Sequence, residues 1–600
     1  WVTNAELNYN TQVFTQNEVR LMTYAHDYNG DAFVRNSGSY VKNNNVKSNH
    51  LNLNVYSTYD FQVRSHNFKF MAGFQYEDYT TSNSGIKNVG VINSDLAVID
   101  LTTGYTYDGK PVAPSFWGNN ASWATAGYFA RVNYDYDERY LFEANIRYDG
   151  SSRFRAENRW AWFPSVSAGW NIAKEPFWES ASRYVNTLKF RMSYGSLGNQ
   201  NIGNWYPTYQ KMGVYINNGA WLQDGKATNT AYSPELISSS LTWETIRSYN
   251  LGLDLGAFNN RLTSSFELYS RYTTNMIGPA QELPSVLGAS VPRTNNTDLR
   301  TYGFDFEVQW KDNLDCGLFY GIRFILSDNQ TEILRYPNDS KLLMTNGIYS
   351  YYPGSHVGDF WGLKTLGIAK TDQEMKAHLA TIPHGGQSWL GTDWRAGDIM
   401  YADLDGNGVI SMESGTLADH GDLIKLGNDQ PRFQFGLDLN ASWKGFDMRV
   451  FFQGVGKRDF WPGYVAFWAS SNQNIWYMLG FEEHLDYFRN TPSGDLDVNL
   501  DSYYPRPLLN AKNQYMQTKY LQDASYIRLK NFTFGYTIPQ KYTQRIKVAN
   551  LRLFFTGENL WTGTRLSSVF DPEGINGNDK ISGIGYPIMK TWACGLTITL

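Results

Sequence analysis

Long apolar runs are absent from this chain. No stretch comes near the ~18 consecutive apolar residues that a membrane-spanning helix needs, so a helical membrane protein is excluded. Charged residues are also sparse, at 18% of the 600 residues, where about a quarter is usual. The two cysteines, Cys316 and Cys594, are too few for a disulfide framework.

A surplus of basic charge is missing as well. The net charge of -5 argues against nucleic acid as a partner. The eight histidines are scattered, and neither a Gly-x-Ser-x-Gly elbow nor a phosphate loop occurs. Glu482-Glu483-His484 lacks the second histidine of a zinc-protease helix. We therefore expect a protein that is not an enzyme and that carries no redox cofactor.

Aromatic residues, by contrast, make up 16% of the chain, and many of them stand in alternating patterns. Apolar residues occupy every second position from Tyr128 to Tyr136 and from Tyr140 to Tyr148, with charged and amide residues between them. Strict alternation sends one set of side chains to each face of a strand. Such a hairpin suits a soluble sandwich, whose apolar face packs a core, or an outer-membrane barrel, whose apolar face meets lipid.

The lengths of the connections distinguish these two folds. Short turns, such as Phe258-Asn259-Asn260 and Lys444-Gly445, alternate with long polar segments along the chain. Outer-membrane barrels sort their connections in this way, with short periplasmic turns and long outer loops, and their strands are about ten residues long. We predict an all-β fold, a large antiparallel transmembrane β-barrel in a lipid bilayer. Its long extracellular loops are expected at about 80–126, 195–245, 273–300, 327–430 and 454–524.

The number of strands bears on the start of the chain. We count about seventeen strands, whereas single-chain bacterial barrels have an even number. If the C-terminus lies on the periplasmic side, the first strand of an odd set begins outside the cell. A complete barrel does not start there. We therefore expect residues 1–600 to form one barrel domain that is incomplete at its N-terminus.

Five segments carry recognisable motifs: "YFARVNYDYDERYLFEANIRYDGSSRF" (128–154), "FPSVSAGWNIAKEPFW" (163–178), "LKFRMSYGSLGNQNIG" (188–203), "GDIMYADLDGNGVI" (397–410) and "SYIRLKNFTFGYTIP" (525–539). In combination they resemble one family, the SusC/RagA branch of TonB-dependent outer-membrane transporters. The resemblance implies a 22-stranded barrel in the bacterial outer membrane with an N-terminal plug. It also implies a SusD-like surface lipoprotein as a lid and energy from TonB, which acts through the plug region. Neither a plug nor a TonB box occurs in this chain.

The resemblance implies import, with oligosaccharides as the expected substrate because the predicted loops are rich in aromatics. Import of peptides by the same mechanism is the alternative within the family. A passive porin or a surface adhesin built on a barrel is the alternative from another class, and a secreted enzyme made of β-sandwich domains is a further one. An N-terminal plug in the parent gene would exclude a simple porin.

One segment has the spacing of a calcium loop. Oxygen-bearing side chains stand at the first, third, fifth and ninth positions of a run that starts at Asp403, and Gly408 occupies the sixth. The twelfth position, normally a bidentate acid, is Ser414, and Glu413 comes one place early. We expect a structural Ca²⁺ or Mg²⁺, and the alternative is a solvated turn without an ion. The expected ligands are Asp403, Asp405, Asn407, Val409 through its carbonyl, Ser411 and Glu413.

Aromatic side chains of the predicted loops are candidates for substrate binding. Flat rings stack on the apolar faces of sugars, and neighbouring amides and carboxylates bind hydroxyl groups. The alternative for each ring is packing within the loop or contact with the lid protein. The candidates are Trp117, Trp123, Trp205, Tyr206, Trp221, Trp461, Trp468 and Trp476.

Charged residues on the polar faces of the strands are expected to line the lumen. They could guide a substrate or hold the plug, and the alternative is a hydrated wall of paired charges. The residues concerned are Arg131, Glu143, Arg147, Lys189 and Arg191.

Overall fold

The computed structural model describes most of the chain, and the structural statements below concern the described residues. Not described are 202, 216–217, 232–233, 235, 280–290, 345–348, 464, 469–479, 509 and 576–587. Within the described part, no helix combines the length and the apolar character needed to cross a membrane.

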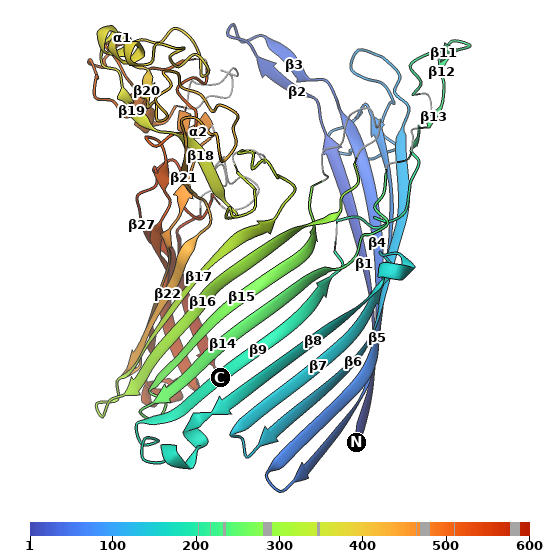
Figure 1. Cartoon of the computed structure of the whole chain (residues 1–600), viewed down its shortest axis with the longest axis vertical. Helices are drawn as coiled ribbons and strands as arrows, with labels where there is room; N and C mark the ends of the chain where they lie inside the picture. The colour runs from blue at the N-terminus through green and yellow to red at the C-terminus, as the bar shows by residue number, and fades with distance from the viewer. Residues whose placement is uncertain are drawn as a thin grey trace. The chain divides into compact units, whose positions relative to one another are not determined.

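One antiparallel sheet dominates the fold, as predicted. Sixteen strands follow one another in it in chain order, separated only by shorter strands of the connections. They are β1 (Val2–Arg20), β4 (Tyr40–Val63), β5 (His66–Val89), β6 (Ser115–Tyr136), β7 (Tyr140–Ser151), β8 (Trp160–Asn171), β9 (Val185–Asn199), β14 (Glu244–Ala257), β15 (Leu262–Ile277), β16 (Asn295–Asn313), β17 (Phe319–Arg335), β22 (Arg432–Trp443), β23 (Phe446–Lys457), β26 (Tyr526–Thr537), β27 (Asn550–Thr564) and β28 (Thr591–Thr599) (Figure 1).

The strand count differs by one from the expected seventeen. The difference arises at residues 18–24, which the count from the sequence takes as a separate strand, whereas β1 continues through Arg20 and pairs with β4 along its whole length. The residues after it form a small hairpin of β2 (Thr23–His26) and β3 (Ala32–Asn36). The sheet therefore has an even number of strands rather than the odd number expected from the sequence.

The chain divides into two compact units, one of residues 1–167, 195–246 and 279–295, and one of the remaining residues. In the first unit, β4 and β5 have 24 residues each and β6 has 22. Strands β5 and β6 extend into the two ends of the predicted loop 80–126, so the connection between them is only 90–114. The polar stretches there pair as strands because serine and threonine also bond across the ladder, as Ser48 does with Thr81 at 3.1 Å.

The hairpin of β6 and β7 has the predicted faces. Tyr134 lies opposite Phe142, and Ala130 lies opposite Ile146. Phe142 and Ile146 are each 43% exposed in the isolated chain. A sandwich would bury this face in a core, whereas a membrane barrel presents it to lipid. The exposure of the apolar face therefore favours the barrel.

In the second unit, two of the predicted long loops are folded. Residues between β17 and β22 form α1 (Asp372–Thr381), β18 (Asp359–Leu363), β19 (Thr365–Ile368), β20 (Ile399–Tyr401) and β21 (Leu423–Asn428). Residues between β23 and β26 form β24 (Asp459–Phe460), α2 (Val465–Trp468), η6 (Glu482–Leu485) and β25 (Gln522–Asp523). Both segments contribute to one hydrophobic core, to which Tyr401, Phe467 and Tyr520 belong. Regions 327–430 and 454–524 are thus not simple loops, and we call this folded part the loop subdomain.

The shorter elements complete the chain. The connection between β9 and β14 contains two-residue ladders of β10 (Val214–Tyr215) with β13 (Thr230–Ala231) and of β11 (Leu222–Gln223) with β12 (Lys226–Ala227). Strands β15 and β16 occupy both ends of the predicted loop 273–300. The remaining short helices are η1 (Ala156–Asn158), η2 (Ile172–Lys174), η3 (Pro176–Trp178), α3 (Gln540–Thr543) and η7 (Gln544–Ile546).

Candidate functional site

Two of the predicted ligand-binding tryptophans gather around one tyrosine in the first unit. Tyr79 of β5 lies directly opposite Trp123 of β6, because their strands are in register at this point. The rings of Tyr79 and Trp123 have centroids 5.8 Å apart at an interplanar angle of 14°. Trp205, from the connection after β9, stacks on the same tyrosine at 5.9 Å and 19°. All three side chains are half-buried, so they retain exposed surface.

Arg153 completes this group, which we call the aromatic cluster: Tyr79, Trp123, Trp205 and Arg153. The guanidinium carbon lies 5.4 Å from the ring centroid of Trp123 and 5.8 Å from that of Trp205, within the range of cation–π attraction. Its Nε atom is buried without a hydrogen-bond partner in the described part of the chain, and burial lowers the pKa of Arg153. A partly desolvated cation beside two indoles can attract an acceptor oxygen of a ligand.

The neighbouring residue Phe154 explains how Arg153 is held. Phe154 is fully buried and packs on Trp243 at 5.5 Å, which fixes the backbone beside Arg153. Sequence analysis did not single out Arg153, although it lies in the quoted segment 128–154. Charge alone did not separate it from the other arginines, and only the fold brings it beside the two tryptophans.

The other predicted aromatics of the first unit lie outside the cluster. The hydroxyl of Tyr206 accepts a hydrogen bond from the backbone N–H of Ser122 at 2.9 Å. Trp117 donates from Nε1 to Asn44 at 2.9 Å. Trp221 is 64% exposed. The structure therefore brings together only Trp123 and Trp205 of these five.

Trp461 and Trp468 belong to the core of the loop subdomain. They are only 5% and 8% exposed and lie 6.0 Å apart, centroid to centroid. The indole Nε1 of Trp468 donates to the carbonyl of Pro462 at 2.7 Å. Their surroundings agree with the packing alternative rather than with an open stacking surface. Trp476 lies outside the described residues.

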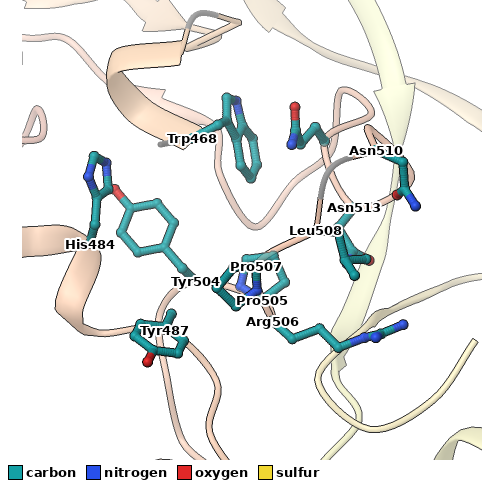
Figure 2. Close-up of a pocket in the computed structure, with 11 residues that line it drawn as sticks. Trp468, His484, Tyr487, Tyr504, Pro505, Arg506, Pro507, Leu508, Asn510 and Asn513 are labelled. Carbon is teal, nitrogen blue, oxygen red and sulfur yellow. The ribbon is translucent and has the colours of Figure 1, made fainter. Parts of the chain in front are cut away.

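A pocket of about 200 Å³ opens beside Trp468 (Figure 2). Its walls are mostly rings, from Trp468, Tyr487, Tyr504, Pro505 and Pro507. Both nitrogens of His484, another lining residue, are occupied: Nδ1 accepts from the N–H of Phe481 at 3.0 Å, and Nε2 lies 3.1 Å from the carbonyl of Phe467. The pocket therefore offers apolar surface and few free polar groups.

The guanidinium of Arg506, below this pocket, is directed to a buried carboxylate instead. Asp398 has no exposed surface and accepts from Arg506 Nε at 2.7 Å and Nη2 at 2.8 Å. Lys512 Nζ lies 2.9 Å from the same carboxylate, and Asn513 donates to it at 2.9 Å. Asp398 thus joins the segment before β20 to the segment before β25. Its role is structural.

The predicted metal loop folds as a tight turn around its first aspartate. Asp403 accepts from the N–H groups of Gly406 at 2.7 Å and Gly408 at 2.9 Å. Asp405 accepts from the N–H and the amide group of Asn407, both at 3.0 Å. Gly406 and Gly408 have φ of +76° and +82°, the left-handed region that glycine enters without strain.

A third carboxylate joins this turn from further along the chain. Oxygen atoms of Asp403, Asp405 and Asp422 lie within 4.8 Å of one another. Burial, together with the charges of Asp405 and Asp403, raises the pKa of Asp422. Glu413 instead accepts from Asn407 at 2.7 Å and from Ser411 at 2.6 Å. Spacing in the sequence could not identify Asp422, because the fold alone brings it to the loop.

The charges predicted to line the lumen are largely paired, either across strands or along one strand. Arg191 lies 2.8 Å from Asp254 and 3.5 Å from Glu267. Arg147 binds Asp149 at 2.8 Å, and Arg131 lies 3.8 Å from Glu143. Lys189 precedes Arg191 by two residues on β9 and so shares its face. This pattern is what the hydrated-wall alternative predicts.

Together, the sixteen-stranded antiparallel sheet, the exposed apolar face and the alternation of connection lengths define an outer-membrane β-barrel protein. The chain belongs to the family described as "TonB dependent receptor-like, beta-barrel", which it matches over residues 1–560. SusC among its relatives supports the SusC/RagA type within that family. Family membership confirms the resemblance, the fold class and the outer-membrane location. It places the chain among receptors and transporters rather than enzymes.

Curated relatives from two organisms are similar along most of the chain. The chain is 27% identical to the TonB-dependent receptor P3 of Formosa agariphila over 575 residues, which are 90% of this chain and 51% of the relative. It is 27% identical to the TonB-dependent receptor SusC of Bacteroides thetaiotaomicron over 474 residues, 78% of this chain and 43% of SusC. The chain thus spans about half the length of these relatives.

A solved structure with the same fold is described as the RagAB peptide transporter. The chain superposes on it with a TM-score of 0.75 at 20% identity, covering 99% of this chain and 60% of the other. At this level of identity the likeness concerns the fold.

Proposed function

We propose that the protein carrying this chain imports oligosaccharides across the outer membrane. TonB drives the import through a plug region, and a SusD-like lipoprotein covers the barrel. Membership of the TonB-dependent receptor family, with SusC among the relatives, is the observation that carries this proposal. The aromatic cluster supports a sugar as substrate. It offers flat rings for stacking and a desolvated arginine for a hydroxyl or carboxylate oxygen.

Peptide import is the second candidate, favoured by the fold shared with the RagAB peptide transporter. The pocket beside Trp468 has apolar walls that would suit a peptide side chain. Growth of a deletion strain on single glycans and on peptides separates the two substrates. Mass spectrometry of the chains that co-purify from the native membrane tests whether a SusD-like lipoprotein is a partner. If both the lipoprotein and a plug region were absent, a porin or an adhesin would be favoured.

Removing both tryptophans of the aromatic cluster is expected to weaken growth on the imported glycan. Each lost ring should cost about 1 kcal/mol of binding, so Trp123→Ala with Trp205→Ala should reduce affinity by roughly tenfold or more. The measurement is growth of the deletion strain complemented with the variant gene at limiting glycan. Trp221→Ala, which removes an exposed tryptophan outside the cluster, is the matched control. Equal growth of the double variant and the control would contradict the sugar-binding role.

We also propose that the turn at Asp403 holds a structural Ca²⁺ or Mg²⁺, with Asp422 as a further ligand beside Asp403 and Asp405. Three carboxylates this close repel one another, and a hard cation would relieve that repulsion. Its role would be to fix the folded connection between β17 and β22.

The double variant Asp403→Ala with Asp405→Ala should lose any stoichiometric cation detected by plasma mass spectrometry of the purified protein. The control is Asp393→Ala with Asp501→Ala, which removes two exposed carboxylates of the same loop subdomain. A cation that stays bound in the first variant, or that leaves both variants equally, would locate the ion elsewhere.

A further inference from the structure

The connection between β26 and β27 differs from other turns at its end of the sheet. It runs from 538 to 549 and contains α3 and η7, whereas β22 and β23 are joined by only Lys444 and Gly445. Because the strands are antiparallel and consecutive, both connections lie at the same end. Short connections mark the periplasmic end of an outer-membrane barrel. The turn therefore faces the periplasmic leaflet.

Its composition combines positive charge with apolar surface. Lys541, Arg545 and Lys547 are exposed, and residues 538–549 contain no aspartate or glutamate. None of the three has an ion-pair partner among the residues described here. Tyr542 is 54% exposed and Ile546 is 65% exposed, which is unusual for large side chains in so short a turn. The ammonium of Lys541 lies 4.8 Å from the ring of Tyr542.

The turn is continuous with the lipid-facing side of its strands. The N–H of Ile538 donates to the carbonyl of Leu551 at 2.9 Å, which ties the start of the turn to β27. Leu553 of β27 lies opposite Leu596 of β28, and these side chains are 49% and 54% exposed. The exposed side chains of Tyr542 and Ile546 thus belong to a turn that is tied to a strand with exposed apolar residues.

Another long turn at this end shows that the charge pattern is particular to 538–549. The connection between β8 and β9, residues 172–184, also exposes large side chains, with Phe177 at 65% and Tyr184 at 59%. Its two basic residues, Lys174 and Arg183, are balanced by Glu175 and Glu179. Only the turn at 538–549 therefore combines apolar anchors with an uncompensated charge of +3.

We propose that the turn 538–549 binds an anionic phospholipid of the periplasmic leaflet. Tyrosine favours the level of the headgroups, and exposed lysine and arginine close to an anionic surface add to the attraction. In this arrangement Ile546 and Tyr542 lie at the boundary between acyl chains and headgroups. Lys541, Arg545 and Lys547 contact the lipid phosphate. This inference rests on the outer-membrane location and is independent of the proposed substrate.

The test is native mass spectrometry of the intact protein purified from its membrane, titrated with phosphatidylglycerol or phosphatidylcholine. The triple variant K541Q/R545Q/K547Q should bind phosphatidylglycerol at least fivefold more weakly, with phosphatidylcholine unchanged. The control K174Q/R183Q/K444Q removes the same charge from other turns at this end and should stay within twofold of the natural protein. Unchanged heat-modifiable gel migration verifies that both variants fold.

Three results would overturn the proposal. The triple variant could bind phosphatidylglycerol as the natural protein does. The control could lose as much affinity as the triple variant, which would make the effect one of net charge. Finally, the triple variant could release a co-purifying acidic periplasmic protein while keeping its lipid, which would assign the surface to a protein partner.

Discussion

Arginine in place of Ile146 is expected to prevent stable insertion of the barrel into the outer membrane. Ile146 lies on the apolar face of β7, is 43% exposed and is opposite Ala130. An arginine facing lipid near the middle of the bilayer costs about 2–4 kcal/mol. Phe142→Arg, two positions away on the same face, should act in the same way.

The matched control is Asn133→Arg on the other face of the same hairpin. Asn133 lies opposite Glu143 and donates to it at 2.6 Å, so an arginine there gains a carboxylate partner in a hydrated surrounding. Heat-modifiable migration and the fraction recovered in outer membranes measure insertion. If Ile146→Arg inserted as well as Asn133→Arg, the assignment of the two faces would be wrong.

Substitution of Asp398 by asparagine is expected to destabilise the loop subdomain by about 3–5 kcal/mol. The change leaves the buried Lys512 and the largely buried Arg506 without their counter-charge, and unpaired buried charges are costly. Asp393→Asn is the control, because the pair of Asp393 with Arg395 is more than half exposed on both sides and should contribute less than ~1 kcal/mol. Limited proteolysis between β17 and β22 measures the difference, and equal cleavage of both variants would contradict the prediction.

The pH dependence of this contribution has a defined sign. Burial alone would raise the pKa of Asp398, but hydrogen bonds from Arg506, Asn513 and Lys512 hold the pKa below the ordinary value of 3.8. A carboxyl group whose pKa is lowered in the folded state stabilises that state at pH values above its ordinary pKa. The contribution is therefore fully present at neutral pH. The contribution is lost as the pH falls below 3.8 through the lowered pKa, and the Asp398→Asn variant, which lacks this carboxylate, should show no such loss.

The sequence by itself determined the class of fold and its faces. Alternation from Tyr128 to Tyr148 depends on the two-residue period of a strand, which no later contact can change. The alternation of short and long connections could be predicted from the polar composition of the segments between the strands. The turn at Asp403 could also be predicted from the sequence, because a turn of aspartate and glycine residues is a local structure held by its own backbone N–H groups.

Tertiary structure alone decided which distant residues meet. Asp422 reaches the turn at Asp403, and Arg153 lies beside both Trp123 and Trp205, because segments far apart in sequence pack together. The regions 327–430 and 454–524 looked like loops because their apolar residues have no regular period. They form one core, in which Trp468 packs on Tyr520 at 4.8 Å. Burial of this kind depends on long-range contacts, and no local pattern of residues encodes them.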